Sequence, residues 1–118
     1  IVGVEPTPGH TIQGLKNMNE SIVPKLYCPE ELDKKIIIGD DEAFEVTRMM
    51  AIKNGIFAGM SSGASLAGAL RIAKNMDSGT IVAILPDRGD RCQWECNNVP
   101  KMGMKSVPPL LKYGNFSL

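Results

Sequence analysis

Short, uniformly apolar runs alternate with longer stretches of helical periodicity along this chain of 118 residues. Residues 1–4 (IVGV), 36–39 (IIIG) and 80–86 (TIVAILP) are rich in β-branched side chains and lie next to Pro or Gly, as buried strands do. Strands that are apolar on both faces occur mainly in parallel sheets covered by helices. Because two helical stretches separate the second and third runs, the sequence predicts an α/β architecture.

The helical stretches carry start and stop signals. Residues 41–54 begin at Asp41, an N-capping residue type, and end before Gly55, where glycine tolerates the positive φ of a helix stop. Their buried face is expected at Ala43, Val46, Met50 and Ala51. Asp40, Asp41 and Arg48 are interpreted as capping and surface residues. We also expect a helix over residues 62–75, a short helix over 10–17 and a helical turn over 29–35.

Composition limits the classes of function. The formal net charge is zero and 43% of residues are hydrophobic, which is typical of a soluble globular protein and offers no basic surface for nucleic acid. The uncharged stretch that ends at Leu70 is interrupted by glycines and serines, so no membrane span is expected. The odd number of cysteines (Cys28, Cys92 and Cys96) fits a reducing compartment, and no second ligand pair supports a zinc site.

The stretch GIFAGMSSGAS, residues 55–65, combines three glycines and three serines with no formal charge. Ser61 or Ser62 could cap the following helix by accepting a hydrogen bond from a backbone N–H group. The free N–H groups and small side chains of a helix start could equally receive a polar ligand group. The local pattern is compatible with both interpretations.

Four stretches, IVGVEP, HTIQGLKNM, GIFAGMSSGAS and ILPDRGDR, follow one another along residues 1–91. Through them the chain resembles the C-terminal part of cysteine synthases (O-acetylserine sulfhydrylases, here of the B-type), which are fold-type II pyridoxal-phosphate (PLP) enzymes. The resemblance implies part of the three-layer α/β sandwich of their large domain. It also implies a cytoplasmic, homodimeric enzyme that makes L-cysteine from O-acetyl-L-serine and sulfide by β-elimination and replacement.

In that family the first serine of the SSG element hydrogen-bonds the pyridine nitrogen of PLP, and this cofactor-binding role corresponds to Ser61 here. A neutral hydroxyl supports a protonated ring less than the carboxylate of many other PLP enzymes, which suits β-elimination. The resemblance assigns no catalytic residue and no metal ligand to this chain. Glu5 and His10 near the end of the first strand, and Asp87 at the end of the last, are weaker polar candidates.

The family's Schiff-base lysine stands in a Ser-x-Lys-x-Arg-like context, which no lysine of this chain shares, and its Gly-Thr-rich phosphate loop is also missing. We therefore expect that further sequence precedes Ile1 in the parent enzyme and that these residues alone do not make cysteine. A cystathionine β-synthase-like fragment and a non-catalytic remnant are the alternatives. Marginal stability is expected, because strands without their neighbours expose edges and apolar surface.

The resemblance stops near Cys92. A back-translation of CQWEC in a shifted reading frame allows Leu-Ser-Val-Gly-Val, close to the Leu-Ser-Thr-Gly-Val that the family has at this place. We therefore divide the chain into residues 1–91, part of the PLP-enzyme large domain, and residues 92–118, a divergent, frameshifted and disordered tail.

Overall fold

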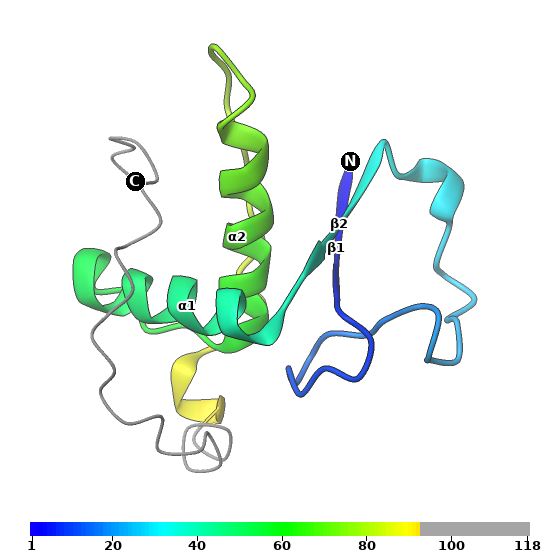
Figure 1. Ribbon diagram of the computed structural model, residues 1–118, viewed down its shortest axis with the longest axis horizontal. Coiled ribbons are helices and arrows are strands. Elements are labelled where there is room, and N and C mark those ends of the chain that lie inside the picture. The colour runs from blue at the N-terminus through cyan, green and yellow to red at the C-terminus, as the bar shows by residue number, and fades with distance from the viewer. Residues whose placement is uncertain (93–118) are drawn as a thin grey trace.

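Two parallel strands and two helices form the described part of the protein, residues 1–92, in this computed structural model (Figure 1). The elements are, in chain order, β1 (Val2–Pro6), the 3₁₀ turn η1 (Pro29–Glu31), β2 (Lys34–Ile38), α1 (Asp40–Asn54), α2 (Met60–Ala73) and the 3₁₀ turn η2 (Gly89–Cys92). The prediction about residues 92–118 lies, beyond Cys92, outside the described residues.

The two strands pair in parallel, with Val2 opposite Lys34 and Pro6 opposite Ile38. Residues 7–33 connect them through turns and η1, and the part of this loop around η1 lies away from the helices (Figure 1). The pairing continues for one more bond, since the Thr7 amide donates to the Ile38 carbonyl at 3.0 Å. Because the strands are parallel, the segments that follow both of them emerge at one end of the sheet.

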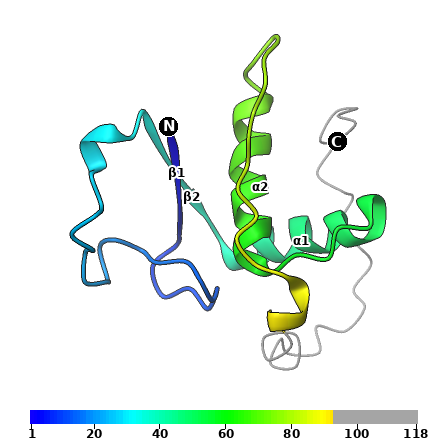
Figure 2. The ribbon, with the colours of Figure 1, turned by 180° about the vertical axis from the view of Figure 1, so that it is seen from behind.

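Helix α2 packs against both strands, and α1 crosses the beginning of α2 (Figures 1 and 2). Two glycines of α2 permit this close packing. A Cβ atom on Gly63 would collide with the Thr47 side chain and a backbone carbonyl of α1, and one on Gly68 would lie 2.7 Å from Val4 Cγ2. The buried core comprises Ile12, Ile36, Ile38, Ala43, Val46, Met50, Ala58, Met60, Ala64, Leu66, Ala67 and Leu70. The predicted α/β class is confirmed.

The helix starts differ from the sequence prediction. Gly39 is the N-cap of α1 and Gly59 that of α2, and neither helix has a side-chain cap. The expected caps at Asp41 and at Ser61 or Ser62 are therefore wrong, because these residues lie inside the first helical turns. The predicted stop of α1 is confirmed, since Gly55 adopts φ 68° and its amide donates to the carbonyl of residue 51 at 3.2 Å.

The expected short helix over residues 10–17 is wrong, because this segment is irregular and turns at Gly14, whose positive φ a right-handed helix does not allow. The Thr11 amide donates to Asp40 Oδ2 at 2.8 Å, and the Ile12 amide donates to His10 Nδ1 at 3.1 Å. Gly14 then adopts φ +83°. The helical turn expected over residues 29–35 is present in shorter form as η1.

The expected buried strand over residues 80–86 is also wrong. Val82 and Ile84 are 87% and 75% exposed, and within residues 1–92 the sheet contains only β1 and β2. A strand requires a neighbour that satisfies its N–H and C=O groups, and here neither strand pairs with this segment. Ala51, expected on the buried face of α1, is likewise exposed.

Candidate functional site

The side chain of Ser61 is buried without a partner. It is the second residue of α2, it is 1% exposed, and its Oγ has no hydrogen-bond partner among the described residues. Burying a hydroxyl without a hydrogen bond costs about 1–3 kcal/mol, and native proteins rarely tolerate it. The hydroxyl is therefore suited to a partner that residues 1–92 do not supply.

A turn that follows β1 lies against this hydroxyl. A Cβ atom built on Gly14 would lie 3.5 Å from Ser61 Oγ, so any side chain at position 14 would fill the space beside it. The φ of +83° at Gly14 favours glycine independently. The Ser61 hydroxyl can donate one hydrogen bond, which none of the described residues accepts.

Ser62, the neighbouring serine, has partners within the chain. Its hydroxyl contacts Asp87 Oδ1 at 2.5 Å and the Asp87 carbonyl at 3.2 Å. The Gly59 amide donates to the same carbonyl at 3.3 Å. These bonds fasten the segment that ends at Asp87 to the first turn of α2. The two serines of the SSG element therefore differ, because only Ser61 has an unused hydroxyl.

The structure gives Glu5 and His10 local roles. Glu5 is 5% exposed, and its Oε1 contacts Lys35 Nζ at 2.7 Å and accepts a bond from the Tyr27 hydroxyl at 3.3 Å. These contacts raise the pKa of Lys35, mainly through its hydrogen bonds with Glu5 and then with Tyr27. His10 accepts the Ile12 amide within its own turn. None of the contacts described for either residue leads to Ser61.

Sequence reasoning missed a contact between the start of α1 and the turn that contains Gly14. Asp40 Oδ2 accepts hydrogen bonds from the Thr11 amide at 2.8 Å and from the Thr11 hydroxyl at 2.7 Å. Asp40 was interpreted as a helix-start residue only. The motif HTIQGL marked the turn as a part of the resemblance, but no periodic pattern connects it with a residue 29 positions away.

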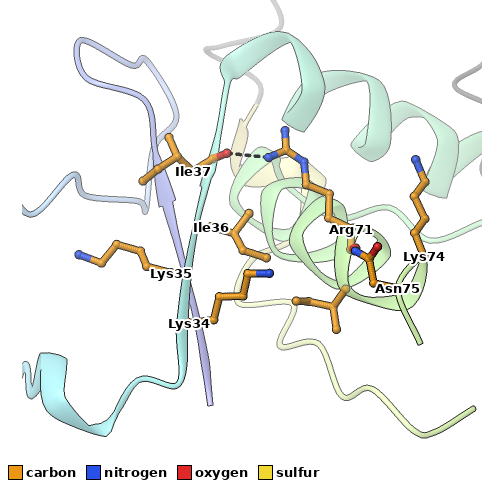
Figure 3. Close-up of a pocket in the computed structure, with 8 residues that line it drawn as sticks. Lys34, Lys35, Ile36, Ile37, Arg71, Lys74 and Asn75 are labelled. Atoms are coloured by element: carbon orange, nitrogen blue, oxygen red, sulfur yellow. Dashed lines mark hydrogen bonds between the residues drawn. The ribbon is translucent and has the colours of Figure 1, made fainter. Parts of the chain in front are cut away.

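A shallow groove of about 550 Å³ lies elsewhere, between β2 and the end of α2 (Figure 3). Arg71 lines it from α2, donates to the Ile37 carbonyl at 3.0 Å and forms an ion pair with Glu42. Lys35 points to the other side of β2 (Figure 3). Because Ser61 lies at the opposite end of α2, this groove is separate from the candidate site.

Neither a metal-binding cluster nor a membrane-spanning helix occurs within residues 1–92. No group of three or more His, Cys, Asp or Glu side chains in this part of the chain could hold a metal ion. No helix in the same region is long and apolar enough to cross a membrane.

Residues 1–87 match the family of pyridoxal-phosphate dependent enzymes, and the chain belongs to that family. Among curated proteins it is similar to cysteine synthase B of Pseudomonas aeruginosa, at 37% identity over 91 residues, and of Escherichia coli K12, at 38%. Each alignment covers 77% of this chain but only 30% of the relative. The resemblance to a segment of a cysteine synthase is thereby confirmed.

Solved structures lead to the same family. The cysteine synthase of Entamoeba histolytica has a TM-score of 0.75 at 28% identity, covering 91% of this chain and 34% of that one. An O-acetylserine dependent cystathionine beta-synthase from Helicobacter pylori has a TM-score of 0.68 at 34% identity, covering 79% and 33%. The chain therefore has the fold of one part of a fold-type II PLP enzyme.

Proposed function

We propose that the chain is part of a PLP-dependent cysteine synthase, which forms L-cysteine from O-acetyl-L-serine and sulfide. The observation that carries the proposal is the buried, unpartnered hydroxyl of Ser61 within the segment that matches the PLP-enzyme family. Curated relatives similar to this chain are cysteine synthases, and the chain spans about 30% of their length. The activity therefore belongs to the whole protein.

Ser61 is the residue that would hold PLP at its ring nitrogen. Its hydroxyl would donate a hydrogen bond to this nitrogen, and its burial would keep water from competing for the bond. When bound, PLP supplies an electron sink for β-elimination and replacement. A hydroxyl brings no negative charge to the ring nitrogen, so it gives a protonated ring little support.

The neighbouring residues would keep that hydroxyl in place. Ser62 and Asp87 fasten the first turn of α2 to the end of the segment over residues 80–86. The turn at Gly14 lies beside the hydroxyl, where a Cβ atom at this position would come within 3.5 Å of Ser61 Oγ. This chain thus supplies the wall at the nitrogen end of the cofactor. We propose that residues outside it bind the phosphate and form the covalent bond.

The nucleophile decides between two reactions. A structural neighbour is an O-acetylserine dependent cystathionine beta-synthase, so homocysteine is the alternative to sulfide. The protein expressed from its gene should be supplied with O-acetyl-L-serine and each nucleophile in turn. We expect cysteine from sulfide at the higher rate. A higher rate with homocysteine would favour the alternative, and no product with either would refute the proposal.

Substitution of Ser61 tests the site itself. In the same protein, Ser61→Ala should lower kcat and change the absorbance of bound PLP, while the partly exposed control Ser65→Ala should do neither. Removing one hydrogen bond to the cofactor should cost roughly tenfold in rate. Wild-type rate and spectrum in Ser61→Ala would remove Ser61 from the cofactor site.

The 118 residues alone should not bind PLP covalently, because no lysine stands in the family's Schiff-base context. Incubation with PLP and cyanoborohydride, followed by intact-mass measurement, should show no stoichiometric adduct. One adduct per chain at a single lysine would contradict this. For the whole protein we also propose a cytoplasmic homodimer. The unpaired Cys28 is compatible with a reducing compartment, and sedimentation would establish the dimer.

A further inference from the structure

We propose that Asp40 is a positioning residue that holds the turn containing Gly14 against Ser61. Asp40 is the first residue of α1 and follows β2 directly, separated from it only by Gly39. It therefore stands on two rigid elements that meet at the end of the sheet. The turn that it contacts connects β1 to the rest of the long loop.

The contact to the turn consists of two hydrogen bonds to one carboxylate oxygen. Asp40 Oδ2 accepts from the Thr11 amide and from the Thr11 hydroxyl, at 2.8 and 2.7 Å. Next in sequence, Ile12 is 2% exposed and belongs to the buried core. The turn is thus held by a charge-assisted contact and by an apolar anchor, two residues before Gly14.

Only one of the two carboxylate oxygens of Asp40 takes part in the contact to Thr11. Asp40 Oδ1 is buried and has no hydrogen-bond partner among the described residues. An amide nitrogen in its place would break no bond, so asparagine should keep the contact to Thr11 through its remaining oxygen. Alanine would remove the acceptor, and the turn would then be held chiefly by Ile12.

The consequence concerns access to Ser61. A Cβ atom built on Gly14 would lie 3.5 Å from Ser61 Oγ, so the turn lies next to this side chain and its displacement should expose the hydroxyl. This inference rests on the proposed function, in which the turn containing Gly14 would shield the hydrogen bond between Ser61 and the cofactor ring from water. The geometry can be tested without any cofactor, so the two proposals can fail separately.

The test measures the chemical accessibility of position 61 in the full chain. Ser61→Cys introduces a thiol there, and its alkylation by iodoacetamide is followed by peptide mass spectrometry with Cys28 as internal reference. Adding Asp40→Ala should accelerate alkylation at position 61 about tenfold, the change produced by losing roughly one net hydrogen bond. Adding Asp40→Asn should leave the rate close to that of the parent.

A control separates a local opening from general loosening of the fold. Ala67→Cys places a thiol at a fully buried position farther along α2, and its alkylation should not respond to Asp40→Ala. Should Asp40→Ala fail to fold, Thr11→Val removes only the hydroxyl bond and Thr11→Ser keeps it. Faster alkylation in Thr11→Val than in Thr11→Ser supports the proposal. The proposal is overturned if Thr11→Val and Thr11→Ser give equal alkylation rates at position 61, or if Asp40→Ala and Asp40→Asn do. It is also overturned if alkylation at position 67 accelerates in parallel with that at position 61.

Discussion

Alanine substitutions at the adjacent serines of α2 should change stability in opposite directions. Ser61→Ala removes a buried hydroxyl that has no partner in residues 1–92, whereas Ser62→Ala removes a hydroxyl that bonds the carboxylate and the carbonyl of Asp87. The two changes are closely comparable, because both residues are serines in the first turn of α2 and both are buried. The difference between them therefore reports the hydrogen bonds.

The magnitudes follow from these contacts. Relief of an unsatisfied hydroxyl, less some lost packing, should stabilise Ser61→Ala by about 0.5–1 kcal/mol. A lost hydrogen bond to a charged group is worth about 1.5–3 kcal/mol, so Ser62→Ala should be destabilised by roughly 1–2 kcal/mol after the gain in helix propensity. For a domain of this size, about 1 kcal/mol moves the Tm by roughly 4–8 °C.

Thermal unfolding followed by circular dichroism at pH 7, with no PLP present, measures both variants. Ser61→Ala should unfold above the wild-type Tm and Ser62→Ala below it, with Ser65→Ala as the control for alanine in this turn. The reasoning is refuted if Ser61→Ala lowers the Tm as much as Ser62→Ala does. That result would mean that Ser61 has a stabilising partner within the chain.

Two further predictions concern packing and pH. Gly63→Ala should lower the free energy of unfolding by about 1–3 kcal/mol, because its Cβ would collide with the Thr47 side chain and a backbone carbonyl of α1. In the same measurement, Ser65→Ala should change it by no more than about 0.5 kcal/mol. Equal changes in the two variants would refute the close approach of the helices. The pKa of Lys35 is raised in the folded state, mainly by Glu5, so its contribution to stability is complete below the ordinary lysine pKa and is lost as pH rises through the folded value. The Tm difference between wild type and Lys35→Met should therefore shrink at strongly alkaline pH, and a constant difference would show that the ion pair contributes nothing.

The elements that sequence reasoning placed correctly are those with local causes. Helix α1 ends at Asn54 because Gly55 can adopt a positive φ, and acidic residues in its first turn favour its positive end. Strand β2 contains the apolar run that predicted it. The SSG element was found through its resemblance, and the structure shows that one of its two serines has no partner in the described chain.

The predictions that were wrong have a different cause, because each of these local structures depends on contacts with a segment far away in the sequence. Residues 80–86 have the composition of a buried strand but have no strand partner within residues 1–92, and composition carries no information about a neighbour. Residues 10–17 form an irregular segment with a positive φ at Gly14, and Thr11 within it bonds Asp40, 29 residues away. Ser62 lies inside the first turn of α2 and caps nothing, and its hydroxyl bonds Asp87, 25 residues away.

The sequence by itself determined the α/β class through its periodicity, and its resemblance to cysteine synthases indicated the family and Ser61 as the residue to examine. Only the tertiary structure decided that the Ser61 hydroxyl has no partner among the described residues while Ser62 bonds Asp87, and that Asp40 bonds Thr11. Hydrogen bonds between distant segments are specific to distance and direction, and a linear pattern specifies neither. The chemistry of the candidate site depends on that difference between two identical neighbouring side chains.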